Sequence, residues 1–343
     1  MNELYNKADD KDVSTAFVFD DKALQRALKH IYEKDFHPMT EIEENLFNET
    51  FRAFTEATND GVSQSSAEVP TEFRQKMDQG NAIFSAFKVH RMQNDIAMQL
   101  YDSNGVLKPF EQWKNDVHPM LDHHVGHWLR TEYDTAVLRA GQAADWQRFE
   151  QYADILPNLE WMPSTSVHPG TDHKAFWGTI LPLDHPFWSV HRPGDRWNCK
   201  CSLSATDAPP TGAPRSSNEP TDRPAPGLDN NPGRDGRLFS DTHPYIANAY
   251  EGAKDAVRKF MAERVEKGKQ MVTDLKKEEQ KRQKERRELL SWYSSNMPTV
   301  KIGKFKAKRF EVDGENISGK VIINRKFYEE VASKHQDLSL IHI

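Results

Sequence analysis

The sequence is poor in cysteine and in apolar residues, and it has no long hydrophobic run. Its 343 residues include two cysteines, Cys199 and Cys201, which cannot cross-link a fold of this size and lie too close together for an unstrained mutual disulfide. No stretch approaches the roughly 18 apolar residues that span a bilayer, and the polar, acidic residues 1–10 differ from a signal peptide. A disulfide-stapled secreted fold is therefore excluded, and we expect a reducing compartment and no membrane partner.

Charge is unevenly distributed along the chain. Hydrophobic residues make up 37% of the sequence and charged residues 29%, so solvated helices or linkers should occupy part of it. The net charge of −6 combines an acidic part, residues 1–250, with a basic part, residues 251–343. The basic excess is small for 93 residues, so nucleic acid is only a weakly supported partner.

The first 155 residues have the apolar spacing of helices. A stripe that includes Leu46, Phe47 and Phe54 predicts a buried face, and Thr40 and Thr71 are candidate N-caps. Residues 60–70, rich in Ser and Gly, predict a loop. The predicted helices cover residues 22–34, 41–59, 71–101 and 110–152.

Helical periodicity ends after Tyr152. Closely spaced prolines, histidines and aromatics up to Leu203 predict an irregular compact module with short strands, one of them at residues 159–162. Large aromatic side chains should form its small core. These are Trp161, Phe176, Trp177, Phe187, Trp188 and Trp197.

The remainder divides by composition. Residues 208–236 contain seven prolines and four glycines and predict an extended linker. A helical pattern resumes at Pro244, and residues 276–288 lack any apolar side chain, which is typical of a solvated single helix. Alternating residues at 299–312 and 320–324 predict strands of a small α+β domain.

Two stretches carry a recognisable pattern of residues. One is LRTEYDTAVLRAG at residues 129–141, and the other is WMPSTSVHPGTDHKAFWGTILPLDHPFWSVHRPGDRWNCKCSL at residues 161–203. Together they resemble the phage Mu F-like head morphogenesis family, which includes minor head proteins similar to the seventh gene product of phage SPP1. The family usually has an arginine three residues before the histidine, whereas residues 168–172 contain none. The resemblance falls on Arg130, Thr131, Glu132, His173, Gly178, Pro182, Asp184, Phe187, Trp188, Trp197, Asn198, Cys199 and Cys201.

The sequence thus predicts a mainly α N-terminal part that runs into an irregular α+β module. A Pro-rich linker, a long charged helix and the start of a truncated α+β domain should follow. The expected divisions are a helical region (1–79), the Mu F-like domain (80–205), the linker (206–240), the charged helix (241–298), a truncated domain (299–337) and a sequencing-adapter artefact, LSLIHI (338–343).

His173, Cys199 and Cys201 carry ligand types that Zn²⁺ prefers, and His168 or His185 are further candidates. Zinc is therefore a candidate cofactor, although both cysteines also suit a buried apolar position. A cysteine nucleophile with a histidine base is conceivable, but no third orienting group is recognisable in the sequence. Arg130 and Glu132 suggest an ion pair rather than catalytic groups.

The resemblance implies a non-enzymatic minor head protein of a phage or prophage, acting in head morphogenesis near the portal. Portal and capsid proteins would be its partners, and it would lie in the virion or, during assembly, in the host bacterial cytoplasm. Family members are often fused to C-terminal toxin domains. A phage-borne effector with a nuclease-like toxin domain, truncated here, is therefore the alternative function.

Overall fold

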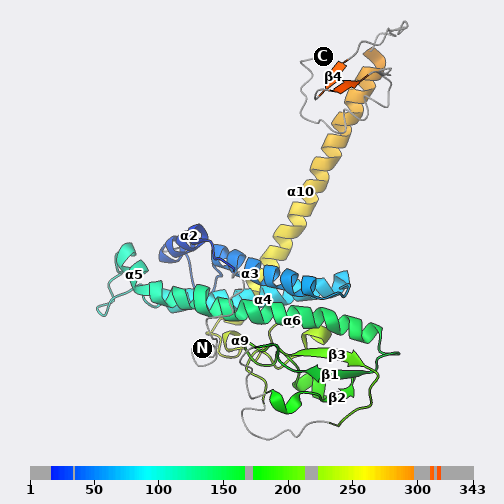
Figure 1. Ribbon diagram of the computed structural model, residues 1–343. Helices are drawn as coiled ribbons and strands as arrows, with labels where there is room; N and C mark the ends of the chain where they lie inside the picture. The colour runs from blue at the N-terminus through cyan, green and yellow to red at the C-terminus, as the bar shows by residue number, and fades with distance from the viewer. Residues whose placement is uncertain are drawn as a thin grey trace. The chain divides into compact units, whose positions relative to one another are not determined.

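The computed structural model describes residues 17–33, 35–166, 173–212, 223–296, 310–312 and 315–317. The chain divides into two compact units, Met1–Ala262 and Glu263–Ile343, which are considered separately (Figure 1). The predicted layout is confirmed: a helical N-terminal part leads into a small antiparallel sheet.

Long helices dominate the first unit, and α3, α4 and α6 lie side by side in it (Figure 1). Helix α3 begins after Glu43, whose carboxylate accepts the Leu46 N–H at 2.7 Å, so Thr40 is not its N-cap. Thr71 is the first residue of α4 and not its cap. The helices are α2 (Asp21–Tyr32), α3 (Glu44–Gln64), α4 (Thr71–Ala97), α5 (Phe110–Leu121) and α6 (Trp128–Gln151).

Helix α3 continues to Gln64, through the first part of residues 60–70, which were predicted as a loop. A Cβ atom at Gly61 would lie 2.2 Å from the Val137 carbonyl oxygen of α6, so the glycine permits close helix contact. The packing gained there outweighs the low helix propensity of glycine, and the true loop begins at Ser65. Leu46, Phe47 and Phe54 are fully buried, as the stripe predicted.

A six-residue π-helical turn, η1 (Asp122–His127), separates α5 from α6. It brings His124 against α4, where the ring Nε2 lies 3.2 Å from Asp95 Oδ2. Burial lowers the pKa of His124 to about 4; the Asp95 contact opposes this shift, and Lys88 and Arg91 add to it. The folded chain therefore holds His124 as neutral imidazole at neutral pH.

This burial predicts a loss of stability in acid. Because the folded pKa lies below the unfolded value near 6.5, the unfolded state binds a proton first as the pH falls. Between pH 8 and pH 5, His124 should lower the free energy of unfolding by about 2 kcal/mol. Urea denaturation of His124→Gln should show a pH dependence that is flatter by this amount. His118→Gln, at an exposed histidine, is the control, and a His124→Gln curve parallel to the wild type would contradict the prediction.

The segment after α6 forms a three-stranded antiparallel sheet of order β2-β1-β3. Its strands are β1 (Asn158–Met162), β2 (Ile180–Pro182) and β3 (Ser202–Thr206), with Leu159 paired to Leu181 and to Ala205. The predicted strand at 159–162 is confirmed. The short helices η2 (Lys174–Phe176) and α7 (Phe187–Val190) lie in the connections.

A second core lies on this sheet. It joins side chains of the module to Trp146 and Phe149 from the end of α6. Of the aromatics predicted to form this core, Trp197 instead packs on the helical core, with its ring stacked 5.9 Å from Phe239. The other members of the module core are Leu159, Trp161, Phe176, Leu181, Trp188 and Cys201, with Trp177 and Phe187 partly buried at its edge.

A linker was predicted at residues 206–240. For residues 223–240, which the structure describes, this prediction is wrong. Leu228, Leu238 and Phe239 are buried in the helical core, and α8 (Pro232–Asp235) packs on α6. A few apolar anchors with many backbone hydrogen bonds order this Pro-rich stretch, which average composition does not reveal. The predicted boundary at 79/80 also lies inside α4.

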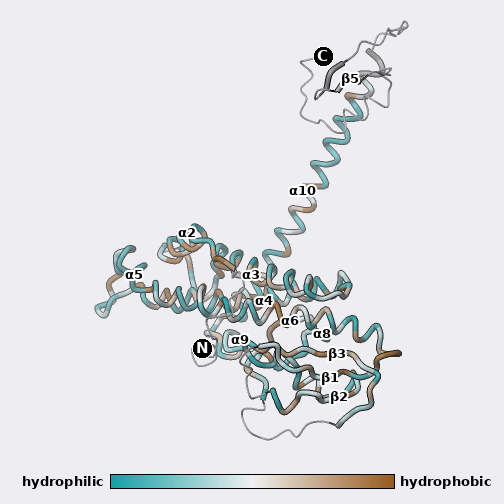
Figure 2. The backbone as a smooth tube through the Cα atoms, viewed as in Figure 1, coloured by the Kyte–Doolittle hydropathy of each residue, from teal (hydrophilic) through white to brown (hydrophobic). Residues whose placement is uncertain are grey.

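Helix α9 (Pro244–Ala247) follows, and then the long helix α10 (Ala253–Asn296). From Glu263 onward, α10 is exposed along residues 263–288, as predicted for the charged run, and Figure 2 colours much of this length hydrophilic. Ion pairs such as Arg282–Glu278 at 2.8 Å link successive turns.

The second unit also contains β4 (Phe310–Val312) and β5 (Glu315–Ile317), which pair antiparallel. Three predictions concern residues that lie wholly or largely outside the described ranges. They are the strand at 320–324, the truncation of residues 299–337 and the LSLIHI ending. Among the helices of the described ranges, none combines the length and apolar character needed to cross a membrane.

Candidate functional site

Three of the predicted ligands meet inside the sheet module. His173 precedes η2, whereas Cys199 and Cys201 precede β3. His173 Nδ1 lies 3.3 Å from Cys199 Sγ and 3.8 Å from Cys201 Sγ. The three ligand atoms all lie within 4.8 Å of one another. Folding thus brings a buried histidine together with two thiols that lie 26 and 28 residues further along the sequence.

Asp195 orients the histidine of this cluster. Its Oδ1 lies 2.7 Å from His173 Nε2, and its Oδ2 lies 3.3 Å from His191 Nδ1. Burial alone would raise the pKa of Asp195, but the hydrogen bonds from the two histidines hold it well below its usual range. Burial also disfavours a charged His173, yet the Asp195 contact raises its pKa to about 9. Sequence reasoning missed Asp195, because its contact with His173, 22 residues away, forms only in the folded chain.

The sulfur atoms are surrounded by N–H groups. The Cys201 backbone N–H donates to Cys199 Sγ at 3.4 Å. A hydrogen bond from the Cys199 thiol, followed by His173 and the indoles of Trp161 and Trp177, lowers the pKa of Cys201 to about 4. Cys199 correspondingly keeps its proton, and its pKa is raised. The site therefore stabilises negative charge on sulfur, which suits either a metal or a thiolate–imidazolium pair.

Two turns place these side chains. Gly178 has φ +76° with no atom within 4 Å of its would-be Cβ, so its backbone conformation and not crowding requires glycine. Asn198 has φ 59°, the one non-glycine residue with positive φ in the described ranges. This left-handed turn directs Trp197 to the helical core and leaves Cys199 in the module core.

The turn at Asn198 can be tested by substitution. Asn198→Ala should destabilise the fold by about 1 kcal/mol relative to Asn198→Gly. The Cβ atom of alanine crowds the backbone at positive φ, whereas glycine has no Cβ atom. Urea denaturation of the two variants measures the difference. Equal stabilities would show that the turn relaxes without cost.

Glu132 is a buried member of the helical core. Its Oε2 lies 2.8 Å from Lys88 Nζ, and Tyr245 donates its hydroxyl to Oε1 at 2.9 Å. Both charged side chains are almost completely buried. The suggested pairing with Arg130 is wrong, because residues two apart on a helix face different directions and Arg130 is exposed.

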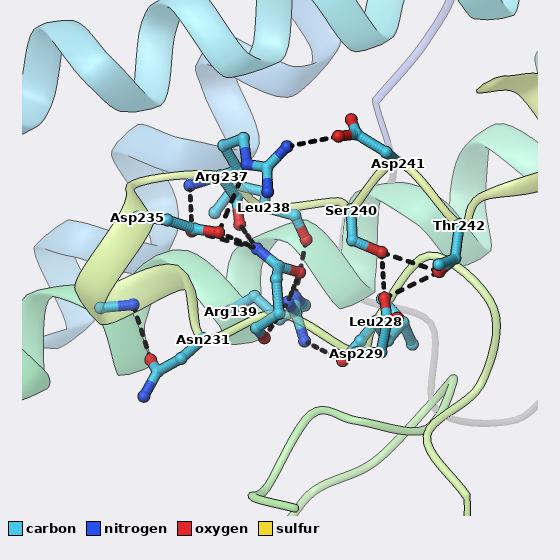
Figure 3. Close-up of polar contacts among 12 residues, drawn as sticks. Arg139, Leu228, Asp229, Asn231, Asp235, Arg237, Leu238, Ser240, Asp241 and Thr242 are labelled. Atoms are coloured by element: carbon cyan, nitrogen blue, oxygen red, sulfur yellow. Dashed lines mark hydrogen bonds and ion pairs between the residues drawn. The ribbon is translucent and has the colours of Figure 1, made fainter. Parts of the chain in front are cut away.

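Arg139 clamps residues 223–243 onto α6 (Figure 3). Its guanidinium is fully buried and donates to four backbone carbonyls and one amide oxygen. The carbonyls belong to Leu238 (2.6 Å), Gly194 (2.7 Å), Asn230 (3.1 Å) and Leu228 (3.3 Å). Asn230, Asp235 and Arg237 extend this network, and Asp229 binds Ser240 and Thr242. This arrangement orders the stretch that composition alone predicted as a linker.

Comparison with family models gives a match to "Phage Mu protein F like protein" over residues 104–204, which include α5, α6 and the sheet module as far as the middle of β3. Residues 104–204 are thus a Mu F-like region. This match supports a part in phage head morphogenesis in the general sense. Comparisons with curated proteins and with solved structures give no significant match.

The motif residues of the Mu F-like region have mostly structural contacts. Thr131 donates its hydroxyl to the His127 carbonyl at 3.2 Å and so bridges the π-helical turn. The Pro182 carbonyl accepts the indole N–H of the buried Trp188 at 2.9 Å. Phe187 is half-buried beside Trp188, and Asp184 is exposed in the turn before α7.

The other ligand candidates do not join the cluster. His185 Nδ1 accepts the Phe187 N–H at 3.1 Å and so caps α7, and it is not among the residues that meet His173. His168 lies outside the described residues, as does the position at which the family usually has arginine. The sequence therefore identified His173, Cys199 and Cys201, whereas Asp195, Lys88 and the role of Arg139 required the structure.

Proposed function

We propose that this Mu F-like protein is a minor head protein that acts near the portal during head assembly of a tailed phage or prophage. Its partners would be the portal and capsid proteins, met in the host bacterial cytoplasm during assembly. It would act by binding and not by catalysis. The match over residues 104–204 is the observation that carries this proposal.

The packing of the first unit supports a scaffolding role. The Mu F-like region packs against other parts of the first unit, because α6 lies along α3 and α8. Arg139 of α6 also donates hydrogen bonds to the carbonyls of Gly194 and Asn230, which are distant from it in the sequence. Residues outside the matched region thus complete its core. A unit whose segments are held together by such contacts can present a fixed surface to a large partner, so that it loses little conformational entropy on binding.

Co-expression with the portal and major capsid proteins of the same genome tests the partner assignment. The tagged full chain should co-purify with its own portal protein and not with the portal of an unrelated phage, which is the matched control. A phage that lacks the gene should yield fewer infectious heads, and the wild-type gene supplied in trans should restore them. Absence of association together with normal heads from the deletion phage would refute the proposal.

A further inference from the structure

We propose that His173, Cys199 and Cys201 bind one Zn²⁺ ion, which fastens the connection between β1 and β2 to the start of β3. The inference does not depend on the head-assembly proposal, because it follows from the donor atoms and their surroundings. Two thiolates and an imidazole form a donor set that Zn²⁺ prefers over harder cations.

The spacing of the donors fits a shared metal. At zinc–sulfur and zinc–nitrogen distances of about 2.3 and 2.0 Å, tetrahedral geometry separates neighbouring sulfur and nitrogen ligands by about 3.5 Å. The two sulfurs lie 3.3 and 3.8 Å from His173 Nδ1, on either side of that value. Each is close enough to bind the same ion after shifts of a few tenths of an ångström.

The surroundings prepare each ligand for a metal. Asp195 accepts a hydrogen bond from His173 Nε2, which leaves Nδ1 as the ring atom that faces the sulfurs. A carboxylate behind a metal-binding histidine commonly fixes the tautomer in this way. The buried indole N–H groups of Trp161 and Trp177 meet no oxygen or nitrogen acceptor among the described residues. Both indoles instead lie beside Cys201.

A purely catalytic use of the thiols fits less well. Cys201 is 2% exposed and His173 is 4% exposed, so a substrate could approach the cluster only at Cys199, which is half-buried. A metal instead explains why three ionisable groups are buried together beneath the rings of the module core, where Trp161 lies 5.1 Å from His173. The sheet has only three short strands, and a metal that closes the 26-residue loop from His173 to Cys199 would stabilise it.

The test uses the purified full chain. Elemental analysis should find about one zinc per chain, and Co²⁺ substitution should give the sulfur-to-cobalt charge-transfer band and strong visible bands of a tetrahedral thiolate site. The chain has no cysteine outside the site, so a thiol reagent should react slowly until a chelator is added. Cys199→Ser, Cys201→Ser and His173→Gln should each lose the metal, whereas His185→Gln, in the same module, should retain it.

Asp195→Asn separates positioning from ligation. It should still bind Co²⁺ with the same type of spectrum, but its zinc affinity should fall roughly 10- to 100-fold, because the histidine loses its carboxylate partner. If the ligand variants fail to fold, the wild-type protein still decides the question. Substoichiometric zinc with no thiolate–cobalt band, or a Cys199–Cys201 disulfide in freshly purified protein, would overturn the proposal.

Discussion

Replacing Arg139 with methionine should lower the free energy of unfolding by roughly 4 kcal/mol or more, because several buried carbonyl groups lose their donor together. The carbonyls of Leu238, Gly194 and Asn230 are the main acceptors. Arg139→Lys should also be strongly destabilising, since a single ammonium cannot reproduce the planar fork of the guanidinium. Urea denaturation followed by circular dichroism measures both losses.

Arg148→Met is the matched control on the same helix. Arg148 is partly exposed and pairs with Asp145 three residues away, so its loss should cost about 0.5 kcal/mol or less. Hydrogen exchange should also show faster exchange at residues 225–240 in Arg139→Met, because these residues depend on the clamp. A loss of less than 1 kcal/mol with unchanged exchange would mean that the segment is held by its apolar anchors alone.

Replacing Glu132 with glutamine should cost about 3–5 kcal/mol, because it leaves the Lys88 ammonium buried without a counter-charge. Burial lowers the pKa of Lys88, and the contact with Glu132 counteracts this. Lys88→Met should be similarly harmful, since it leaves the buried Glu132 carboxylate, which also accepts the Tyr245 hydroxyl, without the Lys88 ammonium. Thermal and urea denaturation of both single variants test this expectation.

The double variant distinguishes a broken pair from lost packing. Lys88→Met/Glu132→Met removes both charges, so it should recover much of the stability that each single variant loses. The exposed pair Asp255–Arg258 provides the control cycle, with a coupling of about 0.5 kcal/mol or less. If the double variant is as unstable as the sum of the single variants, the two charges do not compensate each other and this account of Glu132 is wrong.

Part of the candidate site was accessible from the sequence. His173, Cys199 and Cys201 have the chemistry of metal ligands, and their closeness is now a structural fact. Asp195 could not be singled out, because an aspartate in a Pro-Gly turn is ordinarily a turn residue, and its carboxylate meets His173 only across 22 residues. Likewise the sequence around Lys88 predicts an ordinary solvated lysine on a helix, because its partner, Glu132, lies on another helix.

The sequence by itself determined the elements whose signal is local. Periodic apolar residues predicted the helices around Leu46 and Phe54, and the change to a proline- and aromatic-rich pattern predicted the short strand β1. The absence of apolar side chains from 276–288 predicted the exposed part of α10. Tertiary structure alone decided the rest. Residues 223–240 look like a linker because prolines and glycines give no periodic pattern, yet hydrogen bonds from distant residues such as Arg139 order them. Helix α3 continues past Gly61 because α6 packs closely against this glycine. Contacts between residues far apart in the chain outweigh the local conformational preference of a segment when they give its buried polar groups hydrogen-bond partners. A single sequence does not reveal which residues will make these contacts.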